Sequence, residues 1–152
     1  MSAEFRPTRE GTVKMALGEG EVAFLRHLAS LLDEIGSEPG DPAAERLNVT
    51  PYLDDADASD EYRRLMLPEL EQSRAADRSA FEELLSAAPG GVEMSRGEAE
   101  AMIRVLVEAR LALASRMKVE VEADYQDLDE ENAAALDYLA HLQLALIRAL
   151  DP

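Results

Sequence analysis

The chain contains no cysteine and no tryptophan among its 152 residues. Without cysteine the protein cannot form disulfides, bind a metal through thiolates or use a thiol nucleophile. Only two histidines are present, His27 and His141, and both fall within predicted helices. Hydrolytic triads and zinc sites need histidine close to further reactive or ligating groups. We therefore expect a protein that is not an enzyme and that carries no cofactor.

Basic residues are also scarce, because 15 lysines and arginines stand against 32 aspartates and glutamates, for a net charge of -17. Nucleic-acid binding normally requires a basic face, and the longest basic run here is Arg63-Arg64. We expect no direct binding of nucleic acid and favour a folded protein as the partner. The acidity alone identifies no partner, since it also keeps a protein soluble.

Long hydrophobic runs are missing as well. No uninterrupted apolar stretch approaches the roughly 20 residues that span a bilayer, and the first residues lack the apolar core of a signal peptide. A cytoplasmic protein without membrane contact is the expectation. The length of 152 residues and the 47% of hydrophobic residues predict a single folded domain over residues 1–152.

Residues 1–17 have the pattern of a β-hairpin. Val13, Met15 and Leu17 alternate with other side chains, which is the period of a strand, and Phe5 lies on a short candidate partner strand. An isolated hairpin is only marginally stable. We therefore expect the hairpin to pack on helices or to pair with another strand edge.

Residues 18–152 predict a bundle of four to five helices. Apolar residues recur at helical spacing in four segments. These segments cover residues 19–35, 59–87, 96–117 and 130–150. The acidic connections 37–59 and 118–130 lack this period and are predicted to be loops. The fold class is therefore mainly α, with a small N-terminal β-hairpin.

Three local signals refine the helix boundaries. Ser59 is a good N-cap for the second long helix, and Ser95 with Glu98 spells a capping box before the third. Pro68 predicts a kink or a break near Leu67, because proline removes an amide donor and clashes with the preceding turn. In the second helix one apolar face runs along Tyr62, Met66, Leu70, Ser73, Ala80, Phe81 and Leu84.

Two groups of residues have some of the ligands of a metal site, but neither has all of the residues that such a site needs. Asp55 and Asp57 begin like a calcium-binding loop, but Asp60 occupies the position that requires glycine. Asp137 and His141 lie one helical turn apart and supply two ligands, whereas a zinc site needs three or four. We predict no metal site.

Several short segments stand out in a fixed order along the chain. They are Arg46-Leu47, Pro51-Tyr52, Asp54-Asp55, Glu61-Tyr62-Arg63-Arg64-Leu65, Leu111 with Ser115 and Arg116, and the terminal stretch from Tyr138 to Leu150. Together with the hairpin they resemble an actinobacterial family of unknown function, over nearly the whole chain. The resemblance implies a gene neighbourhood shared with the ClpS protease adaptor. It also implies kinship with AosR-type transcription regulators, which respond to oxidative stress through partners such as sigma factors.

The favoured interpretation is a non-enzymatic regulatory protein that acts through protein–protein contacts in transcription or stress response. The resemblance implies a sigma factor or RNA polymerase as its partner. We expect the contact region at Tyr52, Asp54, Asp55, Arg63 and Arg64, where polar groups crowd beside an anchored loop. The same residues could instead cap and brace the second long helix.

Further interpretations stay open. One is an accessory factor for Clp-type proteolysis, and another is an enzyme with an unrecognised carboxylate or metal site. Direct thiol sensing is excluded, because the chain has no cysteine. A homodimer also stays open, since the broad apolar faces of the first and third long helices could leave a patch uncovered.

Overall fold

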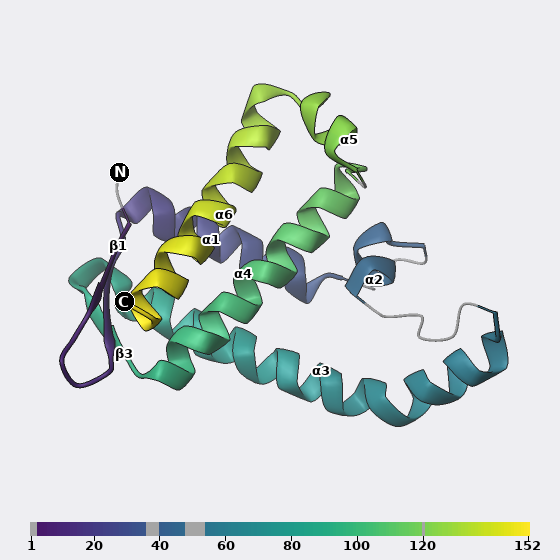
Figure 1. The fold of residues 1–152 in the computed structure, drawn as a ribbon, viewed down its shortest axis with the longest axis horizontal. Coiled ribbons are helices and arrows are strands. Elements are labelled where there is room, and N and C mark those ends of the chain that lie inside the picture. The colour runs from purple at the N-terminus through teal and green to yellow at the C-terminus, as the bar shows by residue number, and fades with distance from the viewer. Residues whose placement is uncertain (1–2, 36–39, 48–53, 120) are drawn as a thin grey trace.

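The computed structural model describes residues 3–35, 40–47, 54–119 and 121–152. Within these residues the chain forms six α-helices and one three-stranded antiparallel sheet (Figure 1). The helices are α1 (Glu19–Asp33), α2 (Pro42–Leu47), α3 (Ala56–Ala87), α4 (Arg96–Arg116), α5 (Glu122–Gln126) and α6 (Glu130–Leu150). The strands are β1 (Glu4–Pro7), β2 (Val13–Ala16) and β3 (Val92–Met94), and the 3-10 turn η1 (Ala88–Gly90) precedes β3. The predicted fold class is confirmed.

The predicted hairpin is present and gains a third strand. β1 and β2 pair antiparallel, and β3 pairs with the free edge of β2 so that Val13 lies opposite Met94. Val13, Met15 and Met94 are buried on the face that packs on the helices. The third strand and the packing on helices thus support a hairpin that would be marginal on its own.

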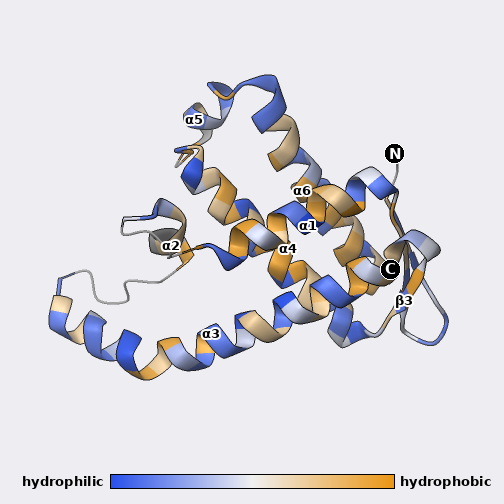
Figure 2. Ribbon diagram, turned by 180° about the vertical axis from the view of Figure 1, so that it is seen from behind, coloured by the Kyte–Doolittle hydropathy of each residue, from blue (hydrophilic) through white to orange (hydrophobic). Residues whose placement is uncertain are grey.

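Helix α4 lies at the centre of the fold. It contacts α6, α3, α2, α1 and β3, and hydrophobic ribbon segments lie where α1, α4 and α6 meet (Figure 2). The largest fully buried side chains of this core include Leu25, Phe81, Leu85, Met102, Leu106, Leu139, Leu142 and Leu146. The capping box that starts α4 forms as predicted, with the Ser95 and Glu98 side chains each accepting the other residue's backbone N–H.

The prediction of loops at residues 37–59 and 118–130 was wrong in part, because each of these segments contains a short helix. In the first, α2 buries Ala43 and Leu47, and Asp41 before it binds Arg116 of α4 at 3.0 Å. In the second, α5 precedes α6, and the Tyr125 hydroxyl donates to the Asp137 carboxylate. Helices of five or six residues complete too few turns to show a helical period in the sequence.

Helix α3 differs from its prediction at two points. It begins at Ala56, and its N-cap is Asp55 rather than Ser59, because the Asp55 carboxylate accepts the Ala58 N–H at 3.0 Å. It also continues through Pro68 as one curved helix (Figure 1), so of the two predicted outcomes, a kink or a break, the break is wrong. Pro68 lies on an exposed stretch, where water can satisfy the carbonyl group that loses its helical donor.

Helix α6 is, among the described residues, the one helix long and apolar enough by length and composition to cross a membrane. Its Leu139, Leu142 and Leu146 are fully buried in the core of this fold, whereas Leu144 and Ile147 are exposed. Membrane contact and cellular location stay predictions from the sequence.

Candidate functional site

The two halves of α3 have different surroundings. Residues 74–87 pack against α4 and α1 and bury Phe81, Leu84 and Leu85. Residues 56–73, which we call the arm, extend beyond α4 (Figure 1) and bury only Ser59. Of the seven exposed large hydrophobic side chains in the described residues, four lie on the arm. They are Tyr62, Leu65, Met66 and Leu70.

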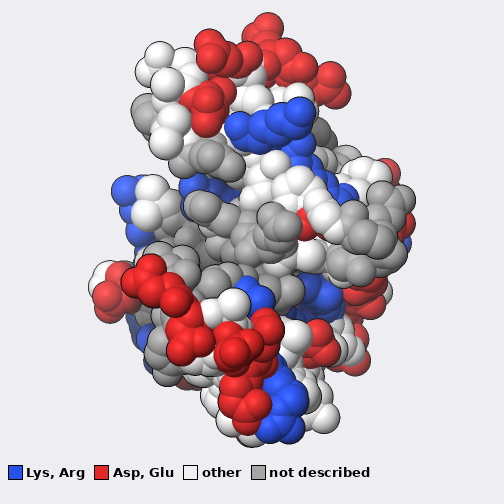
Figure 3. Space-filling model, turned by 90° about the vertical axis from the view of Figure 1, so that its right-hand side faces the viewer, with Lys and Arg blue, Asp and Glu red and all other residues white. Residues whose placement is uncertain are grey.

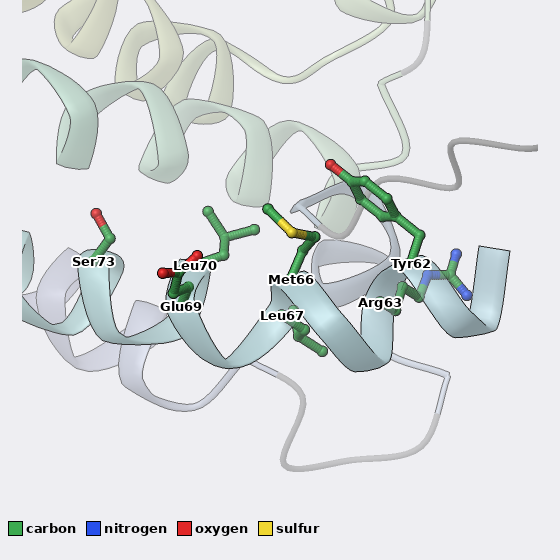
Figure 4. A pocket seen from close by; sticks show the side chains of 7 residues that line it. All are labelled: Tyr62, Arg63, Met66, Leu67, Glu69, Leu70 and Ser73. Atoms are coloured by element: carbon green, nitrogen blue, oxygen red, sulfur yellow. The ribbon is translucent and has the colours of Figure 1, made fainter. Parts of the chain in front are cut away.

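Three of these side chains form a row along one face of the arm. Tyr62, Met66 and Leu70 follow at four-residue steps and are 41%, 43% and 39% exposed. They point to the same side of the helix (Figure 4) and line a groove of about 510 Å³. The described lining is completed by Arg63, Leu67, Glu69 and Ser73, all from the arm. We call this feature the arm groove.

The arm groove lies within an acidic stretch. Residues 54–73 contain seven aspartates and glutamates but only the two arginines Arg63 and Arg64. Figure 3 shows acidic side chains gathered on the end of the molecule toward which the arm extends. Arg63 Nη1 lies 3.8 Å from Asp60 Oδ1, and Arg64 Nη2 lies 2.5 Å from Glu61 Oε1. Such exposed pairs along a helix stabilise it only weakly.

The structure places the predicted contact residues as follows. Asp54 and Asp55 precede the arm, Arg63 lines the arm groove and Arg64 pairs with Glu61. Tyr52 lies outside the described residues. Asp55 has a structural task as the N-cap of α3, and of the predicted residues that the structure describes, only Arg63 borders the groove. The sequence analysis placed Tyr62, Met66 and Leu70 on one apolar helix face, but it did not predict that these side chains are exposed.

A second polar cluster, which sequence reasoning missed, lies between α3 and α4. Arg104 donates to both carboxylate oxygens of Asp77, at 2.8 and 2.9 Å. Glu108 accepts from Arg78 at 3.1 Å and lies 3.9 Å from Arg74. We call these residues the ion-pair seam.

The chemistry of the ion-pair seam is structural. Asp77 and Glu108 are buried and neutralised by arginines, and the hydrogen bonds that Arg104 donates to Asp77 raise the pKa of its guanidinium. Arginine does not give up its proton at physiological pH. These pairs therefore hold α3 on α4 and offer no proton donor or nucleophile.

A third cluster joins α1 to α6. The buried Glu21 carboxylate accepts the Gly18 N–H at 3.1 Å and the Tyr138 hydroxyl. Burial raises the pKa of the Tyr138 hydroxyl, and its hydrogen bond to Glu21 raises it further. The Tyr138 ring also meets the Phe24 ring edge-on, with centroids 5.6 Å apart. Both polar groups are thus engaged in holding the start of α1 against α6.

The histidines do not form a reactive or metal-binding cluster within the described residues. His27 and His141 are exposed, and the Asp137 carboxylate near His141 accepts from Tyr125. Throughout the part of the chain that the structure describes, no group of three or more His, Asp or Glu side chains could hold a metal ion. The arm groove is therefore the candidate site.

The fold and the groove define a class: a mainly helical protein with a small sheet and an exposed apolar groove on one projecting half-helix. The chain belongs to the family described as Domain of unknown function (DUF2017), which matches residues 1–150. No curated protein and no solved structure matches the chain. The predicted resemblance to a family of unknown function is confirmed at this level.

Proposed function

We propose that this protein is a non-enzymatic regulator that acts through protein–protein contacts made by the arm groove. The observation that carries this proposal is the row of Tyr62, Met66 and Leu70, exposed along a half-helix that the described body leaves uncovered. Apolar rows at four-residue spacing are what one helix presents to another. Methionine suits such a surface, because its flexible side chain adapts to different neighbours.

The polar clusters of the described residues support a binding role over catalysis. The carboxylates of the ion-pair seam and Glu21 are buried and already bonded to neighbouring side chains. An active site instead places its reactive groups where a substrate can reach them. An enzyme with a carboxylate or metal site remains the lower-ranking alternative. Metal analysis of the purified protein tests it, and a stoichiometric bound metal would revive it.

The resemblance adds a finer proposal about the process. Its AosR-type relatives point to transcription or stress response, with a sigma factor or RNA polymerase as the partner. The net charge of -17 is consistent with a protein partner rather than a nucleic acid. The implied ClpS neighbourhood suggests an accessory role in Clp-type proteolysis as the second candidate. Because no cysteine is present, neither role can use direct thiol sensing.

The experiment is an affinity pull-down of tagged protein from its native cells, with mass spectrometry of the bound proteins. Three baits are compared: wild type, Met66→Glu in the groove, and Leu144→Glu on the exposed face of α6 as the matched control. Circular dichroism first checks that all three are folded. We expect a sigma factor or RNA polymerase on wild type and on Leu144→Glu, and its loss on Met66→Glu.

Other outcomes separate the candidates. Protease subunits that bind wild type but not Met66→Glu would support the proteolysis role. Equal capture of every protein by Met66→Glu and wild type would remove the arm groove as the contact surface. Gel shifts with DNA at low salt provide the remaining check, and a complex there would contradict the expectation of no nucleic-acid binding.

A further inference from the structure

We propose that the occupant of the arm groove is an amphipathic helix of a basic partner protein. The apolar stripe of this helix packs on Tyr62, Met66 and Leu70, and one of its lysines or arginines lies beside Glu69. This inference rests on the proposed function, which makes the groove a protein-contact surface, and it adds the shape and the charge of what binds there. It depends on the form of the apolar row, the bonding of the arm backbone and the charge of the groove.

The apolar row has the form of a helix contact. From Tyr62 to Leu70 it extends about 12 Å, or slightly more than two turns, at a rise of about 1.5 Å per residue. At about 100° per residue, Tyr62 and Leu70 lie about 40° to either side of Met66, and the three side chains project together from the helix (Figure 4). A partner helix of about three turns, with apolar residues at three- and four-residue spacing, matches this stripe.

The backbone of the arm favours a helix over an extended strand as the partner. Its N–H and C=O groups beside the apolar row are bonded within α3. The carbonyl freed by Pro68 faces away, because this residue lies about 160° from Met66 around the helix. A strand laid on the row would therefore lose water from its own backbone groups and gain no hydrogen bonds in return. A helix brings its backbone hydrogen bonds with it.

The two rims of the groove differ in charge balance. Arg63 and Glu69 both line the groove and lie about 60° to either side of Met66. Arg63 Nη1 lies 3.8 Å from Asp60 Oδ1 of its own helix. The exposed Glu69 carboxylate, in contrast, forms no ion pair or hydrogen bond with any other residue that the structure describes. A cation of the partner therefore finds an unshared carboxylate on one rim, whereas the cation on the other rim already has a counter-charge.

The wider charge of the arm favours the same partner. All seven carboxylates of residues 54–73 are exposed, and both arginines of this stretch pair with two of them. Opposite charge on a partner speeds the encounter and disfavours wrong partners. A nucleic acid or a second copy of this chain, which has a net charge of -17, would instead be repelled. The groove thus combines an apolar centre with acidic surroundings, which is the complement of a basic amphipathic helix.

Fluorescence anisotropy with synthetic helical peptides tests the chemistry of the partner. The probe peptide has leucines at three- and four-residue steps, lysines on both sides of that stripe and alanines elsewhere. In one comparison peptide glutamate replaces every lysine, and in the other serine replaces every leucine. At about 0.15 M salt, the probe peptide should bind wild type at least about tenfold more tightly than either comparison peptide.

Two variants with the same change in net charge test the position of the contact. Glu69→Lys should weaken binding of the probe peptide at least about fivefold, because an attractive contact becomes a repulsive one. Glu71→Lys is the matched control and should bind within about twofold of wild type, since Glu71 is exposed outside the groove lining, about 140° from Met66. Met66→Glu should also weaken binding although it adds negative charge, because a carboxylate interrupts the apolar row. Circular dichroism checks that each variant is folded.

Four results would overturn the inference. They are a probe peptide that does not bind at about 1 mM, a glutamate peptide that binds as tightly as the probe, equal weakening by Glu69→Lys and Glu71→Lys, or a wild-type dimer that Met66→Glu dissociates. The last result would assign the groove to a second copy.

The pull-down separates this inference from the proposed function. A native partner whose capture depends on Met66 but not on Glu69 would contradict only the basic helix. Peptide binding as expected, without any native partner whose capture depends on Met66, would contradict only the regulatory role.

Discussion

The two halves of α3 have similar apolar patterns, but one half is buried in the core and the other is exposed. Phe81 and Leu84 continue the face that Tyr62, Met66 and Leu70 begin, but only the former are covered by α4 and α1. Amphipathic spacing therefore shows which face of a helix is apolar, and it does not show what covers that face. In this protein the same face is core at one end of the helix and exposed at the other, where we propose that it binds a partner.

The largest expected effect on stability comes from comparing an alanine substitution in each half of α3. Phe81→Ala should lower the free energy of unfolding by about 3–5 kcal/mol, because it leaves a cavity in a packed core. Met66→Ala should cost less than about 1 kcal/mol, since its side chain is already 43% exposed. Urea unfolding followed by circular dichroism measures both. Equal losses would mean that the arm is as firmly packed as residues 74–87.

Ion pairs on α4 allow a second comparison of a buried position with an exposed one. Glu108→Ala should cost about 2–3 kcal/mol, because Arg74 and Arg78 would keep their charges in a largely buried position without this carboxylate. Glu100→Ala on the same helix removes only an exposed pair with Arg96 and should change stability by less than about 0.5 kcal/mol. Urea midpoints of the two variants give the comparison. If both fell within error of wild type, the seam would not be what fixes α3 on α4.

The sequence predicted the elements whose signals are local and repeated. The hairpin, α1, α4 and α6 have enough residues for their periods to be read, and the Ser95 capping box marked one boundary correctly. The elements it missed are short. β3 has three residues and exists because it pairs with β2, about eighty residues earlier in the chain, and α2 forms where Ala43 and Leu47 can be buried.

The candidate site was predictable only in part, for a related reason. Tyr62, Met66 and Leu70 could be assigned to one helical face, but their exposure depends on where α4 ends relative to α3. No local pattern marks Glu108 as buried, because its burial beside Arg74 and Arg78 comes from the packing of α3 on α4. Asp55 and Ser59 are both good caps by type, and the position at which the helix starts decided between them.

A smaller effect separates capping from partner contact at the start of the arm. Asp55→Ala should destabilise the beginning of α3 by about 1 kcal/mol, because the Ala58 N–H loses its acceptor. Hydrogen exchange of amides in the arm should then speed up about fivefold, whereas exchange in residues 74–87 should not change. Asp55→Asn preserves a capping oxygen and should behave like wild type, as should Asp54→Ala. Uniform acceleration along the whole of α3 would show that the arm does not open separately.

The smallest expected effect on stability at neutral pH comes from Tyr138, which lies between α6 and α1 and away from the arm. Burial, reinforced by the hydrogen bond to Glu21, raises the pKa of its hydroxyl above the ordinary value of about 10. Above pH 10 the unfolded chain therefore loses the proton while the folded chain still holds it, so the free energy of unfolding must fall as pH rises. Below that pH both states keep the proton and this contribution is constant. Urea unfolding at pH 8, 9, 10 and 10.5 should show a steeper alkaline loss for wild type than for Tyr138→Phe, which has no proton to lose. Parallel curves would mean that the hydroxyl ionises as easily in the folded protein as in the unfolded chain, and that Glu21 and Tyr138 do not jointly hold α1 against α6.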